Sequence, residues 1–295
     1  MHNTARRVAY LCSQVTLPGS PTRRIDAYEH DLMVDALRPA FADVDMHVED
    51  ICWDDETVDW ADFDAAIIGT TWDYWDRQGE YLDKLAEIGS VTKLWNSLEL
   101  IGWNIDKGYL RKLADKGASI IPTLWVDNPT SAAITAAFDH FATDDLVVKR
   151  QVGGSSTGQH RIRRGEAIPE LTQPMMAQPF QPAITTEGEY SFIFVDGALS
   201  HSLNKRPADG DYRIQSEYGG TEEQHQASVD DVEAAVGIIS LLDEVPLYAR
   251  VDMLRLPSGS LALMEMELIE PYLYPEQGPE LGPLIAAAVK RRLSS

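Results

Sequence analysis

The stretch that decides the fold reads "VVKRQVGGSSTG", residues 147–158, in which an apolar β-branched run leads through two cations into a glycine- and hydroxyl-rich segment. A phosphate-binding loop of the Walker A type needs its lysine after the glycines and a helix behind them. Here Lys149 precedes Gly153 and Gly154. The order of the residues therefore argues against a Walker A loop.

A second interpretation is the nucleophile elbow of serine hydrolases. Residues 154–158 satisfy the pattern G-x-S-x-G, with Ser156 in the nucleophile position. An elbow must open into a helix, whereas the next stretch, "QHRIRRGEAIPEL", alternates basic and apolar residues before Gly165 and predicts a returning strand. A serine hydrolase remains an alternative, and it predicts that Ser156→Ala abolishes activity while Lys149→Met does not.

The remaining interpretation is a strand, a glycine-rich hairpin and a second strand. Such a hairpin can wrap backbone N–H groups and hydroxyls around phosphates, with Lys149 pointing from the first strand. The alternative is an exposed hairpin tip without a ligand.

A second feature lies in "YARVDMLRLPSGSLALMEMELIEP", residues 248–271. The turn residues at 257–260 separate two strand-like runs, so we expect Leu256 to pair with Leu261. That register places Asp252 opposite Glu265 and Arg250 opposite Glu267. Facing acids repel each other unless a cation lies between them, and hard oxygen ligands of this kind suit Mg²⁺ together with substrate phosphates. An exposed strand face with scattered ion pairs is the other interpretation.

The wider pattern predicts two kinds of domain. Residues 1–104 alternate strand-like and helix-like runs, as in "RVAYLCS", "DAYEHDLMVDALRPAF" and "DAAIIGTTW", which indicates a βαβ arrangement with a parallel sheet. From about residue 145 the chain is rich in strands, with one helix at about 228–243. We therefore expect an α/β domain followed by an α+β domain.

Composition limits the classes of function. The 295 residues carry 47 acidic and 25 basic side chains, a net charge of −22, which disfavours binding to nucleic acid. No stretch approaches the roughly 20 apolar residues that span a bilayer, and no secretory signal is seen, so we expect a soluble cytoplasmic protein without a membrane partner. Cys12 and Cys52 lie in apolar runs and are expected to be buried thiols. The seven histidines show no metal-ligand spacing.

In order and spacing, these motifs resemble the ATP-grasp superfamily. The resemblance rests on the basic strand and glycine hairpin, "MAQPF", an acid eleven positions on, "KRPADGDYR", and the final D…E-x-E, and it covers most of the chain. The stretch 175–213 looks like bacterial glutathione synthetase-like ligases. The amino-terminal half, with "VDWADFDAAIIGTTWDYWD" and "LWNSLELIGWNIDKGYLRKL", is similar to the branch containing the O-ureido-serine cyclo-ligase of D-cycloserine formation.

The resemblance implies an ATP-grasp fold: an N-terminal Rossmann-like domain, residues 1–104, a first nucleotide-binding lobe, 105–180, and a C-terminal lobe with the magnesium site, 181–295. It implies ATP and two Mg²⁺ ions as cofactors. Groups for ATP would come from Lys107, Lys149, Gly153, Gly154, Ser155, Ser156, Gly158, Gln178, Pro179, Phe180 and, for the ribose, Glu189, with Glu187 as a competitor. The implied catalytic cations are Arg206, Arg213 and Arg250, with Lys205 in addition, and the implied metal ligands are Asp252, Glu265 and Glu267. Many members carry asparagine at the third ligand position, so Glu267 is a departure.

The activity that the resemblance implies is ATP-dependent activation of a small amino-acid-like carboxylate through an acyl phosphate. Cyclisation of O-ureido-D-serine is the specific expectation, and intermolecular amide ligation of the glutathione synthetase type is the alternative. A nucleotide-binding module without catalysis is a further alternative, which a magnesium-dependent ligase assay distinguishes. Homo-oligomers are common among such ligases, although the sequence identifies no interface. The run Trp72 to Trp75 follows a predicted strand, where packing is favoured over substrate contact.

Overall fold

Four parallel strands form the N-terminal sheet of the computed structural model, which describes residues 5–154 and 158–295. Their order is β2-β1-β3-β4, with bounds β1 Arg6–Cys12, β2 Met46–Cys52, β3 Ala65–Ile68 and β4 Lys93–Trp95. Every residue of β3 is buried, which is why its sequence is a continuous apolar run. The predicted βαβ arrangement is confirmed.

Helices cover both faces of this sheet. α1 (Tyr28–Ala42) and α8 (Leu281–Ser294) pack on the side of Tyr10 and Ile67, whereas α2 (Gln78–Val91) packs on the side of Leu11 and Ile68. The two sides alternate along each strand because successive side chains of a strand point to opposite faces. Since α8 is the last helix, the end of the chain completes the core of the N-terminal sheet.

The central sheet is antiparallel and carries the acidic strands. Its order is β11-β10-β9-β12-β13, with bounds β9 Glu189–Val195, β10 Ala198–Arg206, β11 Thr221–Gln224, β12 Tyr248–Arg255 and β13 Leu261–Glu267. α4 (Tyr109–Asp115) and α7 (Val229–Ile239) pack on the face that bears Phe192 and Phe194, while Ile193 and Val195 join the core of the N-terminal sheet. The central sheet is therefore buried on both faces.

The third sheet contains the glycine segment. Its order is β5-β8-β6-β7, with bounds β5 Leu124–Val126, β6 Asp145–Arg150, β7 His160–Arg163 and β8 Met175–Pro179. α5 (Ser131–His140) packs on it. β6 and β7 are antiparallel, with Val148 opposite His160, so the glycine segment joins two strands of a hairpin as predicted. No helix follows it, which contradicts the nucleophile elbow; Ser156 itself lies outside the described residues.

Two details differ from the sequence-based expectations. Arg255, and not Leu256, pairs with Leu261, because the register shifts by one residue between Asp252 and Met253. On the far side of this bulge the predicted pairs Asp252–Glu265 and Arg250–Glu267 are present. The predicted helix at 228–243 is shorter, and Val236, expected on its buried face, is 43 % exposed.

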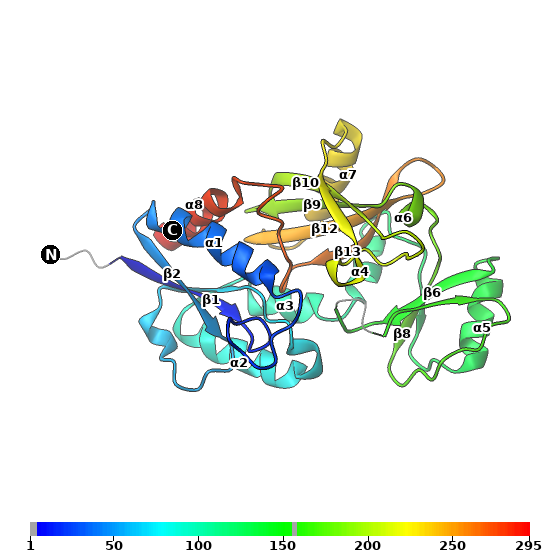
Figure 1. Ribbon diagram of the computed structural model, residues 1–295, viewed down its shortest axis with the longest axis horizontal. Helices are drawn as coiled ribbons and strands as arrows, with labels where there is room; N and C mark the ends of the chain where they lie inside the picture. Colours follow the sequence, from blue (N-terminus) through cyan, green and yellow to red (C-terminus); the bar gives the residue numbers. More distant parts are fainter. Residues whose placement is uncertain (1–4, 155–157) are drawn as a thin grey trace.

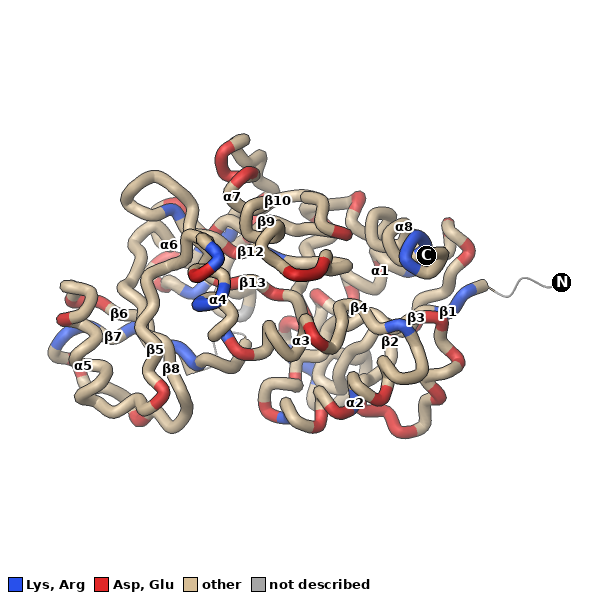
Figure 2. The backbone as a smooth tube through the Cα atoms, turned by 180° about the vertical axis from the view of Figure 1, so that it is seen from behind, with Lys and Arg blue, Asp and Glu red and all other residues tan. Residues whose placement is uncertain are grey.

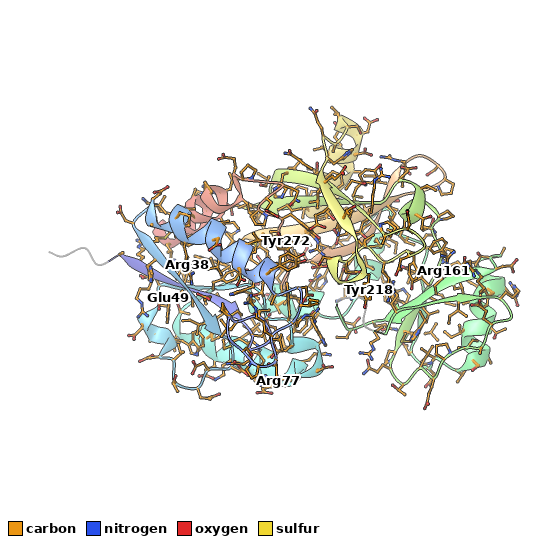
Figure 3. All side chains as sticks on the ribbon, viewed as in Figure 1. Arg38, Glu49, Arg77, Arg161, Tyr218 and Tyr272 are labelled. Carbon is orange, nitrogen blue, oxygen red and sulfur yellow. The ribbon has the colours of Figure 1, made fainter. Side chains whose placement is uncertain are left out.

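The three sheets give an elongated molecule. Figure 1 shows β1, α8 and the C-terminus at the end formed by the N-terminal sheet, and α5, β6 and β8 at the opposite end. In Figure 3, Tyr272 lies in the middle of the molecule beside α1, and Arg161 lies on the third sheet. Acidic residues are spread over the whole backbone in Figure 2, in keeping with the net charge of −22. None of the helices in the described parts of the chain is long and apolar enough to cross a membrane.

Candidate active site

Two adjoining cavities lie where the three sheets meet. We call them the nucleotide-side and the acceptor-side cavity, after the ligands that the ATP-grasp resemblance implies. The nucleotide-side cavity encloses about 940 Å³, including the space at its mouth, and has walls from the third and central sheets, among them Val147, Gln178 and Leu254. The acceptor-side cavity has walls from the central sheet and the N-terminal domain, among them Trp72, Tyr74, Trp75, Arg250, Asp252, Glu270 and Tyr272. Both cavities are lined by Lys107, Gly153, Gly154, Glu189, Ile214, Gln215, Met264, Glu265 and Glu267. The glycine hairpin is the segment between β6 and β7 that contains Gly153, Gly154 and Gly158, and the acidic ribbon is the pair β12 and β13 with Asp252, Glu265 and Glu267. Since both cavities share Gly153, Gly154, Glu265 and Glu267, the glycine hairpin and the acidic ribbon meet at one junction.

Two lysines line the nucleotide-side cavity, and one of them, Lys107, also lines the acceptor-side cavity. The Lys107 ammonium donates a hydrogen bond to the carbonyl oxygen of Gly153 and lies 3.0 Å from Glu265 Oε1. Lys149, on β6, is 8 % exposed and forms no ion pair within the described residues. Burial lowers the pKa of Lys149, although Glu265 opposes the shift. A buried ammonium without a partner carries a desolvation cost that an anionic ligand would offset.

The glycines of the hairpin behave differently from one another. Gly158 has a φ of 70°, a left-handed conformation that favours glycine, and a Cβ there would lie 2.4 Å from Nε of Arg150, so that the arginine side chain would have to move. A Cβ on Gly154 would touch the Trp75 ring at 3.3 Å. The predicted ligands Ser155 and Ser156 lie outside the described residues.

Gln178, Pro179 and Phe180 line the nucleotide-side cavity. The Gln178 amide donates from Nε2 to Thr123 Oγ1 at 2.9 Å. Since the Thr123 hydroxyl donates to the carbonyl of Ile121 at 2.7 Å, Thr123 can only accept from Gln178. The Oε1 atom of Gln178 therefore points away from Thr123 and is available to accept a hydrogen bond.

The aromatic part of this wall is Phe180. The Arg161 guanidinium lies 3.4 Å from its ring centroid, and Tyr212 contacts it edge-on at 6.0 Å. The backbone N–H of Phe180 donates to the Asp145 carbonyl at 2.9 Å. That N–H is therefore not open to a base, and the Phe180 ring offers stacking area instead.

The structure separates the two candidates for the ribose. Glu189 is 1 % exposed, pairs with Lys205 and lines both cavities. Burial raises the pKa of Glu189 to about 7. Glu187 pairs with Arg255 at 3.1 Å and lines neither cavity. Of the two, only Glu189 therefore lies at the cavities.

The three predicted metal ligands lie on β12 and β13, each paired with a cation. Asp252 is bound by Arg250 Nε at 3.0 Å and by Lys205 Nζ at 3.2 Å, Glu265 by Lys107, and Glu267 by Arg250. The Arg250 guanidinium also donates to the Tyr272 carbonyl at 3.0 Å.

These pairings set the charges of the acids. Burial would raise the pKa of Asp252, but Arg250 and Lys205 outweigh it and hold the pKa below its usual value. The pKa of Glu265 is lowered in the same way, by lysines against burial. Burial dominates at Glu267 and raises its pKa to about 7. Asp252 and Glu265 are thus anionic at neutral pH.

The donor chemistry fits Mg²⁺, which prefers carboxylate oxygens and takes its other ligands from phosphates and water. Within the described residues, no group of three or more acidic, histidine or cysteine side chains is gathered tightly enough to hold a metal alone. The carboxylates of Asp252, Glu265 and Glu267 are instead each paired with a lysine or arginine.

The predicted catalytic arginines are distributed unevenly. Arg250 is 8 % exposed and lines the acceptor-side cavity, and Arg213 lines the nucleotide-side cavity while pairing with Asp211 at 2.7 Å. Arg206 is exposed at the end of β10 and lines neither cavity. Its neighbour Lys205 is 4 % exposed and reaches the acids instead.

Sequence reasoning missed several residues of the acceptor-side cavity. Glu29, from α1, accepts a hydrogen bond from the Ser216 hydroxyl at 2.9 Å, and burial raises its pKa to about 7. Glu270 lines the same cavity, and burial raises its pKa to about 8. Trp72, Tyr74 and Trp75 line it too, although packing was the favoured interpretation for them. The one feature of the sequence that could have indicated these residues is Glu270, an acid three positions after the predicted ligand Glu267.

Comparison with known proteins gives consistent matches. A family model described as "D-cycloserine synthetase DcsG, N-terminal domain" matches residues 8–96. The chain is 31 % identical over 245 residues to the cycloserine biosynthesis protein DcsG of Streptomyces lavendulae, covering 76 % of this chain and 82 % of that protein. The glutathione synthetase of Prochlorococcus marinus (strain MIT 9313) is 28 % identical over 179 residues, covering 57 % and 54 %.

Solved structures match over nearly the full chain. The crystal structure of D-cycloserine synthetase DcsG superimposes with a TM-score of 0.83 at 26 % identity, covering 97 % of this chain and 99 % of that one. The ATP-grasp ligase PsnB, complexed with a minimal precursor, gives a TM-score of 0.63 at 13 % identity, covering 98 % and 99 %. The ATP-grasp fold expected from the sequence is confirmed.

Proposed function

This chain belongs to the D-cycloserine synthetase family of ATP-grasp ligases, and we propose that it is an ATP-dependent cyclo-ligase that forms D-cycloserine from O-ureido-D-serine. The proposal rests on the extent of the similarity to the cycloserine protein. It covers 82 % of that protein, against 54 % for the glutathione synthetase.

The chemistry begins with a carboxylate, which is a poor electrophile. Phosphoryl transfer from ATP converts it to an acyl phosphate, and attack by a nitrogen then forms the amide bond and releases phosphate. In O-ureido-D-serine the attacking nitrogen carries a carbamoyl group, so water must afterwards cleave that group, which leaves as carbon dioxide and ammonia, to give D-cycloserine. Lys107 and Lys149 would hold the phosphates of ATP, since Lys107 lines both cavities and Lys149 lines the nucleotide-side cavity. Arg213 and Arg250 would offset negative charge on the transferred group.

The other ends of the nucleotide have matching groups. Glu189 would accept hydrogen bonds from the ribose hydroxyls. Gln178 Oε1, fixed as an acceptor by Thr123, would take the exocyclic amine of adenine, and the Phe180 ring would stack on the base.

Asp252, Glu265 and Glu267 would hold magnesium, which when bound neutralises phosphate charge and aligns the phosphoryl group for in-line transfer. The position of Glu265 and Glu267 on the wall shared by both cavities supports this role, because a nucleotide in one cavity and an acceptor in the other would meet there. We retain from the sequence the proposals of two magnesium ions, domain boundaries after residues 104 and 180, a cytoplasmic location and a homo-oligomeric state.

One structural observation supports the acyl-phosphate chemistry: the two cavities share a wall made of Lys107, the glycine hairpin and the acidic ribbon. An acyl phosphate requires such a junction, because the terminal phosphate and the carboxylate must approach within bonding distance while water is kept out.

The test is incubation with ATP, Mg²⁺ and O-ureido-D-serine, and in parallel with pairs of amino acids, while ADP and product mass are followed. We expect ADP release that depends on O-ureido-D-serine and a product with the mass of D-cycloserine. A coupled product from two amino acids would instead support the glutathione synthetase type of ligation. No ADP release with any carboxylate would contradict catalysis altogether.

A further inference from the structure

Glu270 lies at the place where the second half of the reaction would occur. It follows β13 by three residues and lines the acceptor-side cavity, but not the nucleotide-side cavity. A Cβ on Gly154 would be 3.8 Å from Glu270 Oε1, so the carboxyl group lies against the glycine hairpin. It therefore borders the junction on the acceptor side.

Two aromatic residues of the N-terminal domain hold Glu270 in position. Trp72 Nε1 donates to the Glu270 carbonyl oxygen at 3.0 Å, and the phenol of Tyr74 lies close enough to the carboxyl group to lower its pKa against the effect of burial. Tyr74 and Trp72 are 5 % and 7 % exposed, so their own orientations are fixed by packing. The segment 72–75 thus connects the N-terminal domain to the reacting centre.

Glu270 differs from the other acids near the junction in its partners. Glu265 is paired with Lys107 and Glu267 with Arg250, whereas Glu270 forms no ion pair within the described residues. Burial raises the pKa of Glu270 to about 8, and the charge of Glu267 adds to the rise. A carboxylate in such surroundings is a far stronger base than one in water.

The reaction needs a base at this place. When a nitrogen attacks an acyl phosphate, the new C–N bond forms, the C–O bond to phosphorus breaks, and phosphate leaves with the electron pair. The nitrogen then carries one proton more than the amide product. A positioned base that takes this proton accelerates the step by about 10² to 10⁴.

We propose that Glu270 is the catalytic base of ring closure, the group that receives the proton of the attacking nitrogen, and that Tyr74 is the residue that positions it. This inference rests on the proposed function, because it concerns the fate of the same acyl phosphate. Other acids are less suited: Glu189 pairs with Lys205, and Glu29 accepts from Ser216. His201, although buried, lines neither cavity.

The experiment separates formation of the acyl phosphate from its use. Hydroxylamine in excess reacts with acyl phosphates without an enzymatic base and yields a hydroxamate. Glu270→Gln keeps the shape of the side chain and an oxygen for Tyr74, but it cannot take a proton. We expect Glu270→Gln to form the ring at least about 100-fold more slowly, while hydroxamate formation stays within about threefold of the wild type.

Two further variants sharpen the result. Tyr74→Phe should raise the ratio of hydroxamate to ring product by a smaller factor, about three- to tenfold, because the base is present but less well aimed. A purely structural role for Tyr74 would lower both products together and leave the ratio unchanged. Glu223→Gln makes the same chemical change at an exposed position of β11 and should leave both products unchanged.

The outcomes are distinct. Ring closure by Glu270→Gln at the wild-type rate would overturn the proposal. So would equal loss of ring and hydroxamate in a variant that keeps the wild-type melting temperature, since Glu270 would then act before or outside the nitrogen attack. If Glu270→Gln does not fold, Glu270→Asp and Tyr74→Phe give the same ratio test. Wild-type protein that yields neither ADP nor hydroxamate would instead overturn the proposed function itself.

Discussion

Replacing Lys149 with methionine separates a ligand-binding role from a structural one. Methionine matches the length of the lysine stem but removes the charge. Lys149 is 8 % exposed and has no acidic partner within ion-pair distance among the described residues, although Glu265, Glu189 and Asp252 act on its charge from further away. Loss of one preorganised cationic donor at a phosphate costs about 3 kcal/mol in the transition state. At about 1.4 kcal/mol for each factor of ten, kcat/KM should fall about 150-fold.

Stability should respond in the opposite direction. Burial lowers the pKa of Lys149, which means that the folded protein disfavours the charged form. Methionine removes that cost, so the melting temperature of Lys149→Met should equal or exceed that of the wild type.

The assay measures ADP release with Mg²⁺, ATP and O-ureido-D-serine, together with a thermal melt. Lys116→Met is the matched control, because Lys116 is half-exposed and pairs with Asp243 on the surface. It should keep kcat/KM within about twofold. The reasoning is refuted if Lys149→Met keeps kcat/KM within about threefold, or loses activity only together with its melting temperature.

Four further predictions follow from named contacts. Asn104→Ala removes two buried bonds to β13, Nδ2 to the Met266 carbonyl at 3.0 Å and Leu268 N–H to Oδ1 at 3.1 Å, and should cost about 3 kcal/mol in denaturant unfolding; an effect below about 1 kcal/mol contradicts this. The pKa of Glu29 is about 7 in the folded protein against 4.5 for the ordinary side chain, so the ligand-free wild type loses stability as pH rises from 4.5 to 7. Glu29→Gln should have the same free energy of unfolding as the wild type at pH 4 and be more stable by about 3 kcal/mol above pH 7. A difference in stability that does not depend on pH would contradict this prediction. Thr123→Val frees the Gln178 amide to rotate and should lower the preference for ATP over inosine triphosphate about tenfold in kcat/KM; an unchanged preference speaks against the Thr123 contact. Ser156→Ala should keep ligase activity within about threefold, since the ligase needs no protein nucleophile, and complete loss would favour a hydrolase.

Much of the fold could be predicted because burial leaves a pattern in the sequence. β3 is buried along its whole length, so "AAII" reads as a continuous apolar run. β11, "TEEQ", is a polar edge strand and leaves no such pattern. The register near the β12–β13 turn could not be predicted either, because the extra residue of a bulge does not disturb the apolar character of "LALM". Below the bulge, the spacing of the acids was enough to pair Asp252 with Glu265.

The site was predicted where its residues lie on adjacent strands and missed where distant segments meet. Glu265 and Glu267 share one strand, so their common face follows from alternation. Glu270 and Tyr74 come from opposite ends of the chain, and only the folded structure brings them together. The sequence also could not decide between two neighbouring cations on β10. Because side chains alternate along a strand, only one of Lys205 and Arg206 can face the acids, and in the structure it is Lys205.

The most direct test of the account is a crystal structure with Mg²⁺ and a non-hydrolysable ATP analogue. We expect the triphosphate between the glycine hairpin and the acidic ribbon, with Lys149 on a phosphate oxygen and magnesium bound to Glu265 and Glu267. A nucleotide found elsewhere, or one whose phosphates contact only the hairpin while the carboxylates of β12 and β13 stay paired with Arg250 and Lys107, would contradict it.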